Sequence, residues 1–140
     1  MADKTKSVLI IEDEQTLLDM YKLKFETADY AFFGVGTGEK GIEVAKKNHP
    51  DLILVDLILA NKLEGGHIDG FSVLETLKSN AATKDILVYA LTNLNQDSDI
   101  KRAIEIGADG FLVKSDLTPS QLLKNVKDIF QGKHVGLTLE

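Results

Sequence analysis

The chain has 140 residues, 44% of them hydrophobic and 27% charged, and its formal net charge is −6. This size and balance predict one globular domain with a sizeable core. An acidic chain is poorly suited to grip a phosphate backbone, so direct binding of nucleic acid is not expected. The chain has no cysteine, which excludes a disulfide framework and a thiolate metal site.

Neither a membrane span nor a signal peptide is predicted. No apolar run reaches the roughly 18 residues that a span needs, and residues 1–6 are polar. We therefore expect a cytoplasmic protein without a membrane partner. We divide it into a polar leader at 1–6, one domain at 7–130 and a C-terminal tail at 131–140.

Apolar runs and helical patterns alternate along the chain. Continuous apolar runs are typical of strands buried on both faces of a parallel sheet. The predicted strands are residues 7–11, 30–35, 51–57, 86–91 and 110–113. Apolar residues at helical spacing follow each run and predict a helix after every strand. Repetition of strand and helix predicts an α/β doubly wound sheet, because right-handed crossovers between parallel strands place helices on both faces.

Several helix ends carry recognisable signals. Thr37 and Asp69 are suited to cap the second and third helices, because their side-chain oxygens accept hydrogen bonds from the first helical turn. The second helix should end before Pro50, since the residue preceding a proline avoids the α region. Thr118, followed three residues later by Gln121, predicts a capping box at the start of the last helix.

Groups with a chemical use follow four of the five strands. Ligand sites in open α/β sheets lie outside the carboxyl ends of the strands, so these groups are expected to meet there. They are Glu12 and Asp13 after the first strand, Asp56 after the third, Thr92 after the fourth and Lys114 after the fifth. Two carboxylates about 4 Å apart repel by roughly 4 kcal/mol at an effective dielectric constant near ~20, so such a cluster holds a proton or a cation.

The donor types indicate a particular chemistry. Oxygen ligands without histidine favour a hard ion such as Mg²⁺. Lys114 supplies a point charge for a phosphoryl oxygen, and Thr92 supplies a hydroxyl donor. A carboxylate nucleophile beside a divalent ion and a cation suits phosphoryl transfer onto Asp56, which would form an acyl phosphate.

These residues, in this order and spacing, resemble the receiver domains of two-component response regulators, the superfamily of the chemotaxis regulators. Phe111, three residues before Lys114, matches the family's switch aromatic, and the glycines at 69–71 and 107–110 match its turns. The resemblance covers about residues 7–130. It implies a (βα)5 flavodoxin-like fold with a five-stranded parallel sheet of order 2-1-3-4-5.

The resemblance also implies roles for the site residues. Asp56 would accept a phosphoryl group from the phosphohistidine of a sensor histidine kinase or a phosphotransfer protein. Asp13, Asp56 and the backbone carbonyl of Ile58 would hold Mg²⁺, or Mn²⁺ in its place, with Glu12 acting through a metal-bound water. Lys114 would contact the phosphoryl group.

Thr92 and Phe111 would form the switch: Thr92 would move toward the phosphoryl group, and Phe111 would change rotamer to fill the space. The protein would be a phosphoacceptor switch rather than a turnover enzyme. A downstream protein would bind the face of the fourth helix, fifth strand and fifth helix. The sequence does not decide whether the chain forms a homodimer, nor whether Phe111 is instead an ordinary core aromatic.

The chain departs from the family pattern in three places. The segment 56–70 is longer than usual and lacks the Met-Pro that often follows the aspartate. Asn93 stands where a small residue is usual, and Ser115 stands where proline is common, so a cis peptide is not expected there. Ile58 and Leu94 are apolar at the two positions that flank the path of the attacking water in the family. We therefore predict a long-lived phosphorylated state.

Three other functions fit these residues less well. A phosphatase with an aspartyl nucleophile would need a second aspartate where Ile58 stands. A flavin-binding module would need a phosphate loop rich in serine and threonine where the acidic residues 12–14 stand. A scaffold that is never phosphorylated would have no use for the complete set of acidic and basic residues. Charges at 12–14 could also simply favour a helix N-terminus.

Overall fold

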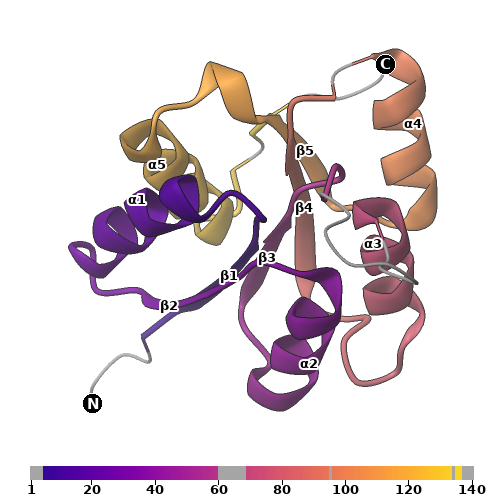
Figure 1. Ribbon diagram of the computed structural model, residues 1–140, viewed down its shortest axis with the longest axis horizontal. Coiled ribbons are helices and arrows are strands. Elements are labelled where there is room, and N and C mark those ends of the chain that lie inside the picture. The colour runs from indigo at the N-terminus through magenta and orange to yellow at the C-terminus, as the bar shows by residue number, and fades with distance from the viewer. Residues whose placement is uncertain (1–4, 60–68, 95, 134, 137–140) are drawn as a thin grey trace.

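The computed structural model describes residues 5–59, 69–94, 96–133, 135 and 136. Strands and helices alternate along this part of the chain, as predicted (Figure 1). The strands are β1 (Ser7–Ile11), β2 (Ala31–Val35), β3 (Leu52–Val55), β4 (Leu87–Thr92) and β5 (Gly110–Val113). The helices are α1 (Gln15–Glu26), α2 (Gly38–Asn48), α3 (Gly70–Ser79), α4 (Asp97–Ile106) and α5 (Pro119–Phe130), with a 3-10 turn, Lys114–Asp116, after β5.

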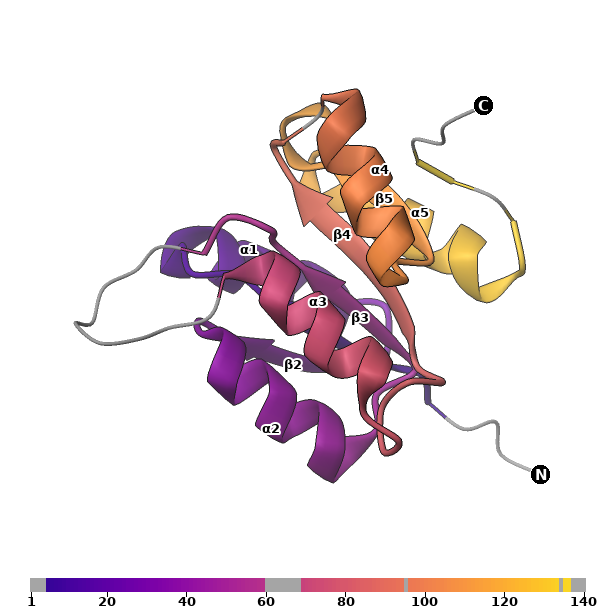
Figure 2. The same cartoon turned by 90° about the vertical axis from the view of Figure 1, so that its right-hand side faces the viewer.

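The strands form one parallel sheet of order β2-β1-β3-β4-β5, which confirms the flavodoxin-like prediction. Helices α1 and α5 cover one face of the sheet, and α2, α3 and α4 lie across the other, which Figure 2 views directly. None of the helices in the described ranges is long and apolar enough to cross a membrane.

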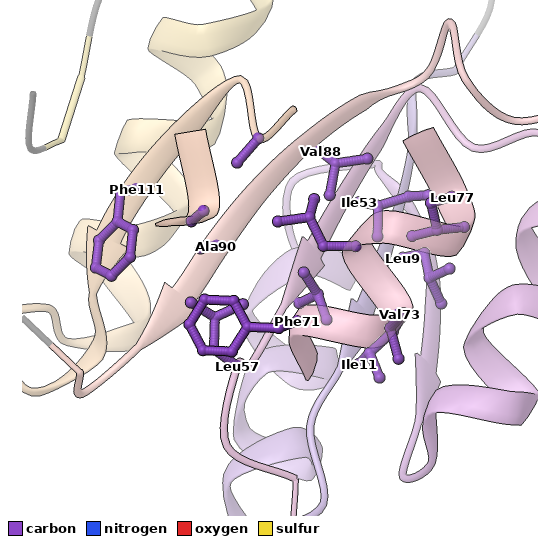
Figure 3. Close-up of a cluster of buried hydrophobic side chains, with 14 of the residues drawn as sticks. Leu9, Ile11, Ile53, Leu57, Phe71, Val73, Leu77, Val88, Ala90 and Phe111 are labelled. Carbon is purple, nitrogen blue, oxygen red and sulfur yellow. The ribbon is translucent and has the colours of Figure 1, made fainter. Parts of the chain in front are cut away.

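Two hydrophobic clusters separate the sheet from its two helical layers. Successive side chains of a strand point to opposite faces, so the side chains of each central strand belong alternately to one cluster and the other. On the side of α2, α3 and α4, the strand residues are Leu9, Ile11, Ile53, Val55, Val88, Ala90, Phe111 and Val113 (Figure 3). On the side of α1 and α5, they are Val8, Ile10, Leu52, Leu54, Tyr89, Leu91 and Leu112. The continuous apolar runs are therefore explained by burial on both faces.

The predicted capping residues act as expected. Thr37 and Asp69 accept hydrogen bonds from the backbone of the first turns of α2 and α3, at 3.2 and 2.9 Å. Thr118 and Gln121 form both hydrogen bonds of the capping box. Helix α2 ends before Pro50, as predicted, and His49 takes a left-handed conformation at φ 46°. The His49 N–H still donates to the Ala45 carbonyl at 3.0 Å, which is the last hydrogen bond of the helix.

Gly70 lets the start of α3 pack directly against the backbone of Asp56 and Leu57. A Cβ at Gly70 would overlap the carbonyl oxygen of Asp56 and the Cα of Leu57. The Gly70 N–H donates to the Leu57 carbonyl at 3.3 Å, so the two chain segments are joined at this contact. The absence of a side chain at this position therefore fixes where the end of β3 lies against α3.

The chain turns back after α5 and covers the outer edge of β5. Gly132 has a φ of 80°, and the Lys133 N–H donates to the Asp128 carbonyl at 2.9 Å, as in a Schellman motif. Gly136 lies so close to the Phe111 backbone that a Cβ would not fit. The described residues of the tail thus bring Gly136 back against the backbone of β5.

We expect Gly70→Ala to lower the free energy of unfolding by about 3 kcal/mol, because the added methyl group meets backbone that cannot rotate away. Urea unfolding followed by circular dichroism measures the change. Gly36→Ala is the matched control, since the nearest atom to a Cβ there is the Glu12 carbonyl at 3.9 Å. Equal stabilities of the two variants would contradict the close packing of α3 at Gly70.

Candidate functional site

The acidic residues stand one position beyond the ends of β1 and β3, where the sheet ladder continues. The Glu12 N–H donates to the Val35 carbonyl at 2.9 Å, and the Asp56 N–H donates to the Ile11 carbonyl at 3.1 Å. Both carboxylates are buried: Glu12 is 2% exposed and Asp56 is 4% exposed. The backbone therefore holds the two side chains next to each other at the carboxyl edge of the sheet.

Lys114 joins these two carboxylates. Its ammonium Nζ lies 2.7 Å from Glu12 Oε1 and 2.7 Å from Asp56 Oδ2. The lysine side chain is itself only 13% exposed. Because two buried carboxylates repel each other strongly, the shared ammonium group is the partner that makes their burial tolerable.

Backbone donors fix the remaining carboxylate oxygens. The Ile58 N–H donates to Asp56 Oδ1 at 2.9 Å, and the Glu14 N–H donates to Glu12 Oε2 at 3.0 Å. Every oxygen of the two carboxylates thus accepts a hydrogen bond. The Asp56 carboxylate is consequently held in one orientation, as a reacting group should be.

Burial and pairing shift the pKa values of this cluster. Burial raises the pKa of Glu12 above its ordinary value, and the hydrogen bond from Lys114 opposes that rise. Burial acts to lower the pKa of Lys114, but its hydrogen bonds to Asp56 and Glu12 prevail and raise that pKa above its ordinary value. The lysine therefore keeps its proton, and the cluster holds a fixed positive charge among its carboxylates.

Asp13 completes an acidic cluster with Glu12 and Asp56. Each of these residues offers one carboxylate oxygen, and these oxygens lie within 4.8 Å of one another. Asp13 is half-buried, whereas Glu12 and Asp56 are buried. A compact set of oxygen donors that is partly open to solvent fits a hard divalent cation that retains several waters.

Thr92 lies at the same edge of the sheet and is fully buried. Its hydroxyl accepts a hydrogen bond from the Leu94 N–H at 3.4 Å. Asn93, which departs from the family pattern, has a structural role: its side-chain oxygen accepts a hydrogen bond from the Ser115 N–H at 2.7 Å. This bond connects the segment after β4 to the segment that follows Lys114. An asparagine beside Thr92 gives no sequence signal for a partner 22 residues away.

Phe111 is fully buried in the cluster between the sheet and α2, α3 and α4 (Figure 3). Its ring therefore does not lie on the surface of the protein in this conformation. A change of its rotamer stays a prediction.

The peptide bond between Lys114 and Ser115 is trans, as expected, since the described residues contain no cis peptide bond. Residues 60–68 of the long segment lie outside the described residues.

Comparison with known proteins identifies the family. Residues 8–127 match the family model described as the response regulator receiver domain. The chain belongs to this family. Its phosphoacceptor candidate, acidic cluster and lysine thus occupy a receiver domain, and the acidic cluster is of the type found at receiver-domain metal sites.

Related proteins share this domain over most of the chain. A nitrate/nitrite response regulator protein homolog from Haemophilus influenzae is 36% identical over 95% of the chain and 60% of its own length. The DNA-binding dual master transcriptional regulator RpaA from Synechocystis is 36% identical over 76% of the chain and 42% of its own length. The chain therefore spans about half the length of these curated relatives.

Solved structures show the same fold. The chemotaxis response regulator CheY4 of Vibrio cholerae superposes with a TM-score of 0.77 over 90% of the chain and 99% of its own, at 21% sequence identity. At that identity the likeness concerns the fold alone. It confirms the flavodoxin-like arrangement of the receiver domain.

We expect Lys114→Met to lower the free energy of unfolding by about 3 kcal/mol in the presence of a chelator, because it leaves two buried carboxylates without a cation. Urea unfolding measures this loss. Adding Glu12→Gln to Lys114→Met should restore part of the stability, since it removes one of the unpaired charges. Lys124→Met is the control: Lys124 is 76% exposed, and its pairing with Asp128 is worth little. A Lys114→Met protein as stable as that control would refute the stabilising role of the bridge.

Proposed function

We propose that this receiver domain is a phosphorylation switch in which Asp56 accepts a phosphoryl group from the phosphohistidine of a sensor histidine kinase or phosphotransfer protein. The observation that carries this proposal is the setting of Asp56. Its carboxylate is buried and oriented by the Ile58 N–H, and it lies beside a lysine and two further carboxylates. In the transfer, an Asp56 oxygen attacks phosphorus as the bond to the histidine nitrogen breaks.

Asp13 and Asp56 would bind Mg²⁺, or Mn²⁺ in its place, with the Ile58 carbonyl as a third protein ligand and Glu12 acting through a water. When bound, such an ion would supply positive charge for the phosphoryl oxygens. Lys114 would act on the phosphoryl oxygens as a second positive charge. It already lies 2.7 Å from Asp56 Oδ2, so a short movement brings its ammonium group to a phosphoryl oxygen. The lysine thus exchanges one anionic partner for another.

Thr92 and Phe111 would convert this chemistry into a signal. A phosphoryl group adds about −1.5 to −2 charges and strong acceptor oxygens, and it shifts a conformational equilibrium only through contacts that differ between the two states. The Thr92 hydroxyl would make such a contact by moving toward the phosphoryl group. Phe111 and Thr92 lie on the neighbouring strands β5 and β4, so the side chain of Phe111 would take up the space that this movement opens.

The altered surface would be the face formed by α4, β5 and α5, where a downstream protein would bind. Two curated relatives carry names that describe a response regulator and a DNA-binding transcriptional regulator. An output in gene regulation is therefore one reading of the pathway, although the chain matches only about half of those proteins. A turnover phosphatase is a poorer candidate, because Ile58 offers an apolar side chain where that enzyme needs a general acid.

Incubation with Mg²⁺ and acetyl phosphate should add the mass of one phosphoryl group to the wild-type protein, as measured by intact mass spectrometry. Asp56→Asn should gain no such mass, because an amide oxygen is a far weaker nucleophile than a carboxylate. Asp69→Asn is the control, since Asp69 caps α3 and lies outside the acidic cluster. A wild-type protein that gains no mass would refute the switch.

Ile58→Asn should shorten the lifetime of the phosphorylated state several-fold. Ile58 is 52% exposed and its N–H is bonded to Asp56, so its side chain lies at the rim of the site. An amide there can orient an attacking water, which an aliphatic side chain cannot do. The decay of the added mass after removal of acetyl phosphate measures the lifetime. Ile58→Val is the control, and equal decay of all three proteins would show that the rim does not set the lifetime.

A further inference from the structure

A buried phenol, that of Tyr21, lies on the side of the sheet that α1 and α5 cover. Tyr21 is 2% exposed and belongs to the cluster between the sheet and α1 and α5. Its hydroxyl makes no hydrogen bond within the described ranges of the chain, although a buried tyrosine normally finds a partner. An unpaired hydroxyl of this kind calls for an explanation.

The cluster around Tyr21 ends directly beneath the acidic residues. Ile10, Leu54 and Leu112 belong to that cluster. Two residues beyond each of them along the chain stand Glu12, Asp56 and Lys114. Because residues two apart share a face of a strand and the ladder continues through Glu12 and Asp56, these two side chains extend the face on which Tyr21 packs. Lys114 is bonded to both of them.

The direction of α1 turns the Tyr21 ring toward this edge. The helix begins at Gln15, three residues after Glu12, so its N-terminus lies at the carboxyl edge of the sheet. Side chains of a helix lean toward its N-terminus, which directs the long phenol of Tyr21 upward to the site. Burial, and then the negative charge of Glu12, raise the pKa of Tyr21 to about 12, so the hydroxyl keeps its proton and remains a donor.

We propose that Tyr21 is a positioning residue that donates a hydrogen bond to Glu12 when Lys114 leaves it for a phosphoryl group on Asp56. This inference rests on the proposed function. In the present state Lys114 satisfies Glu12 Oε1 at 2.7 Å, so Tyr21 is not required. Once the ammonium group follows the phosphoryl oxygens, the buried Glu12 carboxylate loses that donor. The Tyr21 hydroxyl then replaces it and stabilises the phosphorylated state.

The test compares binding of Mg²⁺ alone with binding of beryllium fluoride, a mimic of the phosphoryl group, in the presence of Mg²⁺. Tyr21→Phe keeps the ring and removes the hydroxyl. We expect it to weaken beryllium fluoride binding by about tenfold, as for a lost hydrogen bond to a charged group. It should change the affinity for Mg²⁺ alone by less than about twofold, because Lys114 still serves Glu12. Tyr89→Phe, at another buried tyrosine of the same cluster, is the control and should bind both like the wild type.

A spectroscopic measurement separates positioning from packing. The chain has three tyrosines and no tryptophan, so the ultraviolet difference spectrum on adding beryllium fluoride reports on tyrosine alone. Wild type and a Tyr30→Phe, Tyr89→Phe double variant, in which only Tyr21 remains, should give the same signal. Tyr21→Phe should give none. The double variant keeps the test valid even if Tyr21→Phe does not fold.

The outcomes distinguish the two proposals. Failure of the wild type to gain a phosphoryl group from acetyl phosphate would refute the proposed function and this inference with it. Normal phosphorylation of the wild type, with no tyrosine signal from the double variant, would overturn the inference alone. Equal affinity of wild type and Tyr21→Phe for beryllium fluoride would do the same.

Discussion

The repulsion between Glu12 and Asp56 is the constraint on which the site depends. Two buried carboxylates side by side can both stay charged only if a cation lies between them, and Lys114 supplies that cation at 2.7 Å from each. The lysine is therefore a resident counter-ion that any incoming metal or phosphoryl group must displace or share. Binding of either group would change which partners the Lys114 ammonium group contacts. The carboxylates themselves would stay fixed, because the sheet holds them rigidly.

That frame comes from ordinary folding forces. The central strands are buried on both faces, which fixes their register and holds Glu12 and Asp56 at the same level. Gly70 then brings α3 against the backbone behind Asp56, and the Asn93 side chain connects the segments after β4 and β5. The Asp56 carboxylate is thus supported from several elements, and each support is a packing or hydrogen-bonding feature.

Much of this arrangement could be predicted from the sequence, because the signals are local. Apolar runs gave the strands, and the hydroxyl and carboxylate caps at Thr37, Asp69 and Thr118 marked helix starts that the structure confirms. The convergence of acidic residues followed from the parallel topology. Features that join distant residues could not be predicted in this way: Lys114 and Glu12 are 102 positions apart, and nothing in the spacing indicates that the lysine bonds both carboxylates. The place of Tyr21 beneath them depends likewise on how α1 packs.

The contact between Gly70 and Leu57 has a consequence for the segment between them. The two residues are joined by a hydrogen bond of 3.3 Å, and Asp69 caps α3, so both ends of residues 58–69 are anchored by the fold itself. The entropy of closing a loop grows only slowly with its length, so its ends stay together whatever the chain between them contains. This position should therefore accept the insertion of a whole foreign module, such as a ligand-binding domain, within a few residues of the aspartate. A receiver domain built in this way offers a place to connect a second input directly to its acidic cluster.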